Sequence, residues 1–329
     1  MNMKSVFFLL STLLFLNGYG LVTSKQQKAD PKSQCETPAA RVPLADPYIL
    51  LHDGTYYAYG TGAPDGIFVF ESDDLQTWRQ APGRATGGLA LHKDDVYGEK
   101  WFWAPEVYCV GGKFYMFFSA EEHICVAVSD SPLGPFMQQE QKPMIEGEKC
   151  IDNTLFIDDD GRKYMYFDRF NDGLNIWVCE LEENLTEIKP ETLRKCIHVS
   201  QEWETVWPRV NEGSFVMKHK GTYYMTYSAN SYESPNYGVG CATADSPTGP
   251  WVKYDYNPLL QFPGELTGVG HSAMFRDKKG ELRIVFHAHN NKEEIHPRYM
   301  YFSHVTFRDK NGVDAMEIDK NYMVPQLAE

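Results

Sequence analysis

The sequence is short of long apolar runs, of closely spaced cysteine pairs and of positive charge. After the N-terminal segment, no stretch reaches the roughly 18 apolar residues that a membrane-spanning helix needs. The seven cysteines include no C-x-x-C pair, which disfavours a metal cluster. Lysine and arginine total 31 against 45 aspartate and glutamate residues, and the formal charge of -14 disfavours nucleic acid and anionic lipid as partners.

The rest of the composition is that of a globular protein. Hydrophobic residues make up 43% of the 329 positions and aromatic residues 14%, which is enough to bury a large core. All-β domains often exceed about 200 residues, so this length is compatible with one domain. The acidic charge also favours a neutral ligand over a polyanionic one. Cys125, Cys179 and Cys241 lie in apolar runs and are expected to be buried thiols, whereas pairing of Cys150 with Cys196 stays open.

The first residues have the pattern of an export signal. Lys4 supplies a positive charge, residues 6–16 are apolar, and a small and polar segment follows at residues 17–20. No cysteine stands where a lipid-anchored precursor would be cut. We therefore expect a signal peptide over residues 1–23, a linker over 24–41 and the folded domain over 42–329. The mature protein is expected to be secreted or periplasmic, with no membrane insertion after signal removal.

The sequence contains five similar units. Each begins with an apolar strand, continues through a tight turn containing Asp-Gly, Gly-Gly or Lys-Gly, and returns in a second strand of alternating aromatic and aliphatic residues. A third strand is expected in every unit, over residues 67–71, 124–129, 175–180, 237–244 and 299–305. Five repeats of several strands, without helical periodicity between them, predict an all-β, single-domain, five-bladed β-propeller. A β-sandwich is the less favoured alternative.

Polar residues stand at the openings of these units. Because the first strand of each blade lines the central channel of a propeller, the opening residues are expected to converge there. They are Asp46, the segment 103–106, Asp152, Glu212 and His271. A charged residue before a buried strand is often only a solvated turn. Several carboxyl groups around one cavity, however, would have pKa values pushed apart, as acid and base catalysis requires.

These motifs resemble glycoside hydrolase family 43, whose members are five-bladed propellers acting on arabinose- and xylose-containing polysaccharides. The resemblance extends from about Val42 to Asp314. It implies that Asp46 in Ala-Asp-Pro is the general base, that Asp152 in Ile-Asp-Asn-Thr-Leu-Phe modulates a neighbouring pKa, and that Glu212 in Glu-Gly is the general acid.

Three further residues are candidates through the same resemblance. Trp103, in Trp-Ala-Pro-Glu, is expected to form a wall of the substrate site, and Arg298 to reach the sugar. His271, in Gly-His-Ser, is expected to approach a central metal ion or water. The chemistry needs no cofactor, although the resemblance leaves room for a structural Ca²⁺ in the channel. His287 and His289 alternate on one strand, where metal ligation is the less favoured interpretation.

The residue types fit glycosidic bond cleavage by inversion. One protonated carboxyl group donates a proton to the leaving oxygen, and one carboxylate activates a water molecule. The two carboxyl groups of an inverting enzyme stand about 6.5–9.5 Å apart, so that the water fits between them. We expect removal of terminal α-L-arabinofuranosyl residues from a neutral, plant-derived oligosaccharide or polysaccharide, by a monomeric enzyme. The alternatives are β-xylosidase or endo-1,4-β-xylanase activity and, from another class, a non-catalytic sugar-binding propeller.

Overall fold

The computed structural model describes residues 40–206, 209–310 and 313–328. The expected signal peptide and most of the expected linker lie outside the described residues. Ala40 and Arg41, which the sequence assigns to the linker, pair with the last strand: Leu327 N–H donates to Ala40 O, and Arg41 is bridged to Gln326. The propeller therefore begins at least two residues before the predicted boundary.

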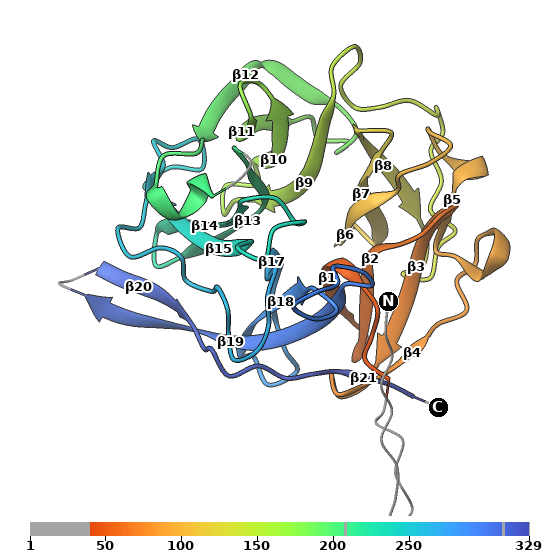
Figure 1. Ribbon diagram of the computed structural model, residues 1–329. Helices are drawn as coiled ribbons and strands as arrows, with labels where there is room; N and C mark the ends of the chain where they lie inside the picture. The colour runs from red at the N-terminus through yellow and green to blue at the C-terminus, as the bar shows by residue number, and fades with distance from the viewer. Residues whose placement is uncertain (1–39, 207–208, 311–312, 329) are drawn as a thin grey trace, which may run out of the picture. The chain divides into compact units, whose positions relative to one another are not determined.

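Five separate sheets surround one axis, with β1, β6, β9, β13 and β17 innermost (Figure 1). The first sheet holds β1 (Ala45–His52), β2 (Thr55–Ala63), β3 (Gly66–Ser72), β4 (Thr77–Gln80), β5 (Leu91–His92) and β21 (Gln326–Leu327). The second holds β6 (Trp103–Val110), β7 (Lys113–Ala120) and β8 (His123–Ser129). The third holds β9 (Cys150–Ile157), β10 (Lys163–Phe170), β11 (Leu174–Leu181) and β12 (Ile188–Ile197).

The last two sheets have four strands each. The fourth holds β13 (Asn211–His219), β14 (Thr222–Ala229), β15 (Gly238–Ala244) and β16 (Val252–Lys253). The fifth holds β17 (Gly270–Arg276), β18 (Leu282–Ala288), β19 (Tyr299–Lys310) and β20 (Val313–Ile318). The described helices are three short 3-10 turns, η1 (Thr86–Gly88), η2 (Lys93–Asp95) and η3 (Glu202–Thr205). The predicted five-bladed propeller is confirmed.

The first two strands of the blades form hairpins where the sequence predicts them. His52 pairs with Thr55, so Asp53 and Gly54 alone make the turn. Both have positive φ, 46° and 76°, as a two-residue hairpin of this kind requires. The expected third strands are also found, as β3, β8, β11, β15 and β19. The second blade is the exception among outer strands, because its expected fourth strand is reduced to one bridge between Val128 and Met137.

Each innermost strand has a β-bulge near its start, and one residue at every bulge has positive φ. These residues are Asp46 (48°), Ala104 (45°), Asp152 (56°), Gly213 (57°) and His271 (46°). In the fourth blade the position equivalent to Asp46 is therefore Gly213. Glu212, expected among the opening residues, stands one position earlier in its blade than Asp46 and Asp152 do in theirs.

Side chains packed between neighbouring sheets form the core. Trp78 of the first blade is fully buried and stacks on Phe302 of the fifth, with ring centroids 6.0 Å apart. The strand β21, from the end of the chain, adds in parallel to β4 and so closes the ring. Within the described ranges, no helix is long and apolar enough to cross a membrane.

The five cysteines named in the sequence analysis are all free thiols. Cys125, Cys179 and Cys241 are fully buried thiols, as expected. Cys150 and Cys196 are also free thiols, so the pairing that the sequence left open is not formed.

Candidate active site

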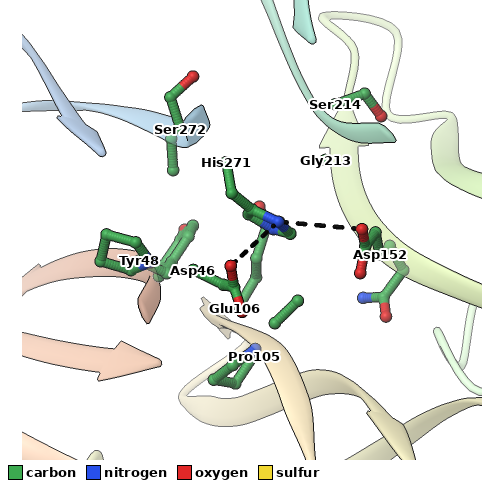
Figure 2. A pocket seen from close by; sticks show the side chains of 13 residues that line it. Asp46, Tyr48, Pro105, Glu106, Asp152, Gly213, Ser214, His271 and Ser272 are labelled. Atoms are coloured by element: carbon green, nitrogen blue, oxygen red, sulfur yellow. Dashed lines mark ion pairs between the residues drawn. The ribbon is translucent and has the colours of Figure 1, made fainter. Parts of the chain in front are cut away.

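The bulges surround a narrow cavity of about 10 Å³ at the centre of the ring. Its lining includes Asp46, Asp152 and His271 together with Gly213, the residue after Glu212. Figure 2 shows these residues converging from different blades. The positive φ values at Asp46, Asp152 and His271 are unusual for residues with a Cβ, and such strain is common at functional sites. Of the predicted opening residues, Asp46, Asp152, His271 and the segment 104–106 line the cavity, whereas Glu212 and Trp103 are not part of its lining.

Arg298 holds Asp46 as a carboxylate, and His271 and His287 lie beside it. Arg298 Nη1 donates to Asp46 Oδ1 at 2.7 Å, and Nη2 to Oδ2 at 3.3 Å. Burial alone would raise the pKa of Asp46, but Arg298, His271 and His287 outweigh it and hold this pKa well below its usual value. A carboxylate that stays ionised and faces a cavity is suited to accept a proton from water.

Glu212 is buried beside Gly213, which lines the cavity, and its pKa has the opposite tendency. Burial raises the pKa of Glu212 to about 7, although a hydrogen bond from Tyr237 opposes the rise. Tyr237 Oη donates to Glu212 Oε1 at 2.6 Å. Gly213 follows with positive φ, and a Cβ there would lie 3.0 Å from His271 Nδ1, so a side chain in the position after Glu212 would press on His271. Glu212 is therefore protonated at mildly acidic pH and is suited to donate a proton.

His271 extends between Asp46 and Asp152 (Figure 2). Its Nδ1 lies 3.5 Å from Asp46 Oδ1 and 3.9 Å from Asp152 Oδ2. Burial lowers the pKa of His271, so the ring is neutral at neutral pH. Burial raises the pKa of Asp152, and the charges of Glu212 and Asp46 raise it further. The pKa of Asp152 therefore depends on the charges of both Glu212 and Asp46.

Trp103 begins β6 and precedes the bulge of its blade, as Glu212 does in the fourth blade. Its ring stacks on that of Trp101, with centroids 5.7 Å apart and planes 18° apart. Trp101 is 45% exposed, and Lys100 Nζ lies 4.2 Å from the centre of its ring. The exposed ring of Trp101, supported by Trp103, gives an apolar surface beside β6.

The cavity also offers neutral oxygen atoms. Three of the bulge residues are each followed by a polar residue that lines the cavity: Asn153, Ser214 and Ser272. Their oxygen atoms are buried and have no hydrogen-bond partner among the described residues. The described part of the chain has no group of three or more histidine, cysteine or acidic side chains placed to hold a metal. Ca²⁺ prefers six to eight oxygen ligands. The donors present therefore fit a hydrated cation or ordered water, and do not fit an ion chelated by carboxylates.

Three residues of the site were missed as site residues from the sequence. Tyr237, just before β15, contacts Glu212. Asp168 on β10 contacts both Gly213, the residue after Glu212, and the side chain of Asp152. His287 on β18 contacts Asp46. The alternation of His287 with His289 was a signal for His287, although its partners are Asp46 and Arg298. Asp168, a charged residue inside an aromatic strand, was the other available signal.

Comparison with known proteins finds a matching family and several relatives of this chain. The family described as Glycosyl hydrolases family 43 matches residues 35–311. The chain is 46% identical to a solved structure described as endo-1,4-beta-xylanase from Bacteroides thetaiotaomicron VPI-5482, with a TM-score of 0.83, covering 89% of this chain and 99% of that one.

Two curated relatives have other activities. One is an extracellular exo-alpha-(1->5)-L-arabinofuranosidase of Streptomyces chartreusis, 28% identical over 286 residues, or 76% of this chain and 81% of the relative. The other is the beta-D-galactofuranosidase xynD of Aspergillus niger, 27% identical over 268 residues, or 74% of this chain and 73% of the relative.

Proposed function

Since the chain belongs to glycosyl hydrolase family 43 and is a glycosidase, we propose that it cleaves its substrate with inversion, using Asp46 as base and Glu212 as acid. The observation that carries this assignment is the contrast between two buried carboxyl groups, of which Asp46 lines the cavity and Glu212 precedes the cavity-lining Gly213. The pKa of Asp46 is held well below its usual value, whereas that of Glu212 is raised to about 7. Divergent environments of this kind separate a base from an acid.

In the proposed reaction Glu212 protonates the oxygen of the leaving sugar. Asp46 removes a proton from water, which attacks the anomeric carbon from the opposite face. Arg298 keeps Asp46 ionised and oriented. Its Nε is buried and without a partner among the described residues, which leaves a donor for a sugar oxygen.

A terminal α-L-arabinofuranosyl residue is the proposed substrate group. Two relatives whose names denote furanosidases support this proposal. The wider substrate would be a neutral plant oligosaccharide or polysaccharide met outside the cell, in keeping with the N-terminal export pattern.

Cleavage of β-xylan is the second candidate, and one observation favours it. The structure that is 46% identical to this chain is described as an endo-1,4-beta-xylanase. The surface of Trp101 and Trp103 would extend the site beyond one sugar, as a polymer requires. A purely sugar-binding propeller is less favoured, because binding needs no buried pair of carboxyl groups with opposed pKa shifts.

The test compares release of 4-nitrophenol from the α-L-arabinofuranoside and the β-D-xyloside, followed by arabinan and xylan. Asp46→Asn serves as the control, because it removes the base with little change in shape. Arabinofuranoside hydrolysis that is lost in Asp46→Asn is the expected result. A preference for the xyloside or for xylan would support the second candidate, cleavage of β-xylan. Absence of hydrolysis of all four substrates would overturn both candidate functions.

A further inference from the structure

Hydrogen bonds between neighbouring blades join the five bulges into a ring. The backbone N–H of each bulge residue donates to a side chain on the second strand of the preceding blade. The pairs are Ala104 with Thr61 (3.0 Å), Asp152 with Ser119 (3.1 Å), Gly213 with Asp168 (3.0 Å), His271 with Ser228 (2.8 Å) and Asp46 with His287 (3.1 Å). The five acceptors occupy equivalent positions, since each lies opposite the residue before its own blade's bulge.

Three of the acceptors are hydroxyl groups, which suffice to satisfy a buried N–H. The two exceptions are Asp168 and His287, and they stand beside the two proposed proton carriers. Asp168 receives the N–H of Gly213, next to Glu212, and His287 receives that of Asp46. A serine would satisfy each of these two backbone N–H groups, so the presence of an aspartate and a histidine indicates an additional role for them.

Asp168 is fully buried, and its two oxygens have different surroundings. Oδ2 accepts the Gly213 N–H, whereas Oδ1 receives no hydrogen bond from any donor in the described part of the chain. The side chain of Asp152 lies within hydrogen-bonding reach of Asp168. Two carboxyl groups in such contact need a proton between them, because two buried charges at that distance repel strongly.

We propose that Asp168 is a positioning residue that stays protonated, donating a hydrogen bond from its carboxyl O–H to Asp152 while it accepts the N–H of Gly213. This bridge links the aspartate that modulates the site to the strand segment of Glu212. It keeps the negative charge of the pair on Asp152. The consequence for catalysis rests on the proposed function, whereas the protonation of Asp168 does not.

The groups around Asp168 agree with this assignment. Burial raises the pKa of Asp168, and Asp152 and Glu212 raise it further. The hydrogen bond with Asp168 lowers the pKa of Asp152, whereas the same hydrogen bond raises the pKa of Asp168. The other titratable neighbours are Cys150 on β9, whose pKa burial raises to about 11, and Cys196 on β12, whose pKa burial also raises. Both thiols are neutral near pH 7.

The first test measures stability and does not depend on activity. Thermal unfolding of the wild type and of Asp168→Asn is compared between about pH 5 and about pH 8. The unfolded Asp168 ionises near its ordinary pKa of 3.8. A raised folded pKa therefore destabilises the wild type progressively as the pH rises, and the asparagine variant escapes this loss. The Tm of the variant relative to wild type should increase with pH; a constant or falling difference would overturn the proposal.

The second test uses pH profiles of kcat/KM for Asp168→Asn and Asp168→Ser. Asparagine preserves both hydrogen bonds of a protonated aspartate, so we expect kcat/KM within about threefold of wild type and an unchanged profile. Serine preserves only the acceptor for Gly213 N–H, as at Ser119 and Ser228. We expect a loss on the order of tenfold and an acidic limb shifted to higher pH, because Asp152 loses its donor.

Thr61→Val is the matched control, since it removes an acceptor of the ring beside a residue outside the proposed acid and base. It should lower the Tm without moving the pH profile. Two kinetic results would overturn the proposal: an alkaline limb moved to lower pH in Asp168→Asn, which would mean an ionised Asp168, or a serine variant identical to wild type. Absence of glycosidase activity in the wild type would refute the proposed function, while the stability test still decides the protonation of Asp168.

Discussion

Removing the hydroxyl group of Tyr237 tests the electrostatics of the proposed acid. In the folded protein Tyr237 Oη donates to Glu212 Oε1 at 2.6 Å, and both groups are buried. This hydrogen bond stabilises the ionised form of Glu212 and opposes the effect of burial on its pKa. Tyr237→Phe keeps the ring, which stacks on His287, and removes only the donor.

The expected shift follows from the strength of such a bond. A hydrogen bond to a charged group contributes about 1.5–3 kcal/mol, and about 1.36 kcal/mol corresponds to one pKa unit. The pKa of Glu212 is about 7 in the wild type. It should rise by about one unit or more in the variant, since water entering the gap would recover part of the loss. The alkaline limb of the kcat/KM profile should move upward by the same amount.

The assay is hydrolysis of a nitrophenyl glycoside from about pH 4 to about pH 10. Tyr224→Phe is the matched control, because Tyr224 donates to the backbone oxygen of Asp314 and not to a site residue. Its profile should match that of the wild type. An alkaline limb that stays in place or moves downward in Tyr237→Phe would refute the assignment of that limb to Glu212.

Three further predictions concern substrate binding, metal and stability. Trp101→Ala should raise KM roughly three- to tenfold for oligosaccharides but not for nitrophenyl monoglycosides, because an exposed aromatic surface contacts only the longer substrate; equal effects on both would contradict this. Dialysis against EDTA should leave kcat/KM unchanged, because the acid and base are carboxyl groups; activity that is lost and then restored by Ca²⁺ would show that a metal is required. Lys253→Met should lower the free energy of unfolding by about 3–5 kcal/mol, measured in urea, because it leaves the fully buried Glu204 without its 2.6 Å partner; a smaller loss in the double variant with Glu204→Gln is the check.

The fold could be predicted from the sequence because the hairpin turns of the blades have recognisable local sequences. The turn at Asp53 and Gly54 needs positive φ, and Gly111–Gly112 and Lys220–Gly221 repeat it. Asp46 and Asp152 could likewise be placed in the channel, because they open apolar strands at a recurring position. The position of Glu212 shows the limit, since the sequence pattern does not indicate which residue at the start of a strand takes the positive φ of the bulge.

The partners of the site residues could not be predicted in the same way. Asp168 lies 45 positions before Gly213 and His287 lies 241 positions after Asp46. Their contacts arise only when the second strand of one blade packs against the first strand of the next. The pKa separation of Asp46 and Glu212 depends on those contacts and on burial, which the sequence pattern indicates only in general terms.

The anomeric configuration of the first product tests the central assignment most directly. Proton NMR recorded during the first minutes of hydrolysis distinguishes the anomers before they interconvert. With Asp46 activating water opposite Glu212, an α-linked substrate should release the β anomer first, and Asp46→Asn should release neither at a measurable rate. Initial release of the α anomer would mean a covalent intermediate and would contradict the roles assigned to Asp46 and Glu212.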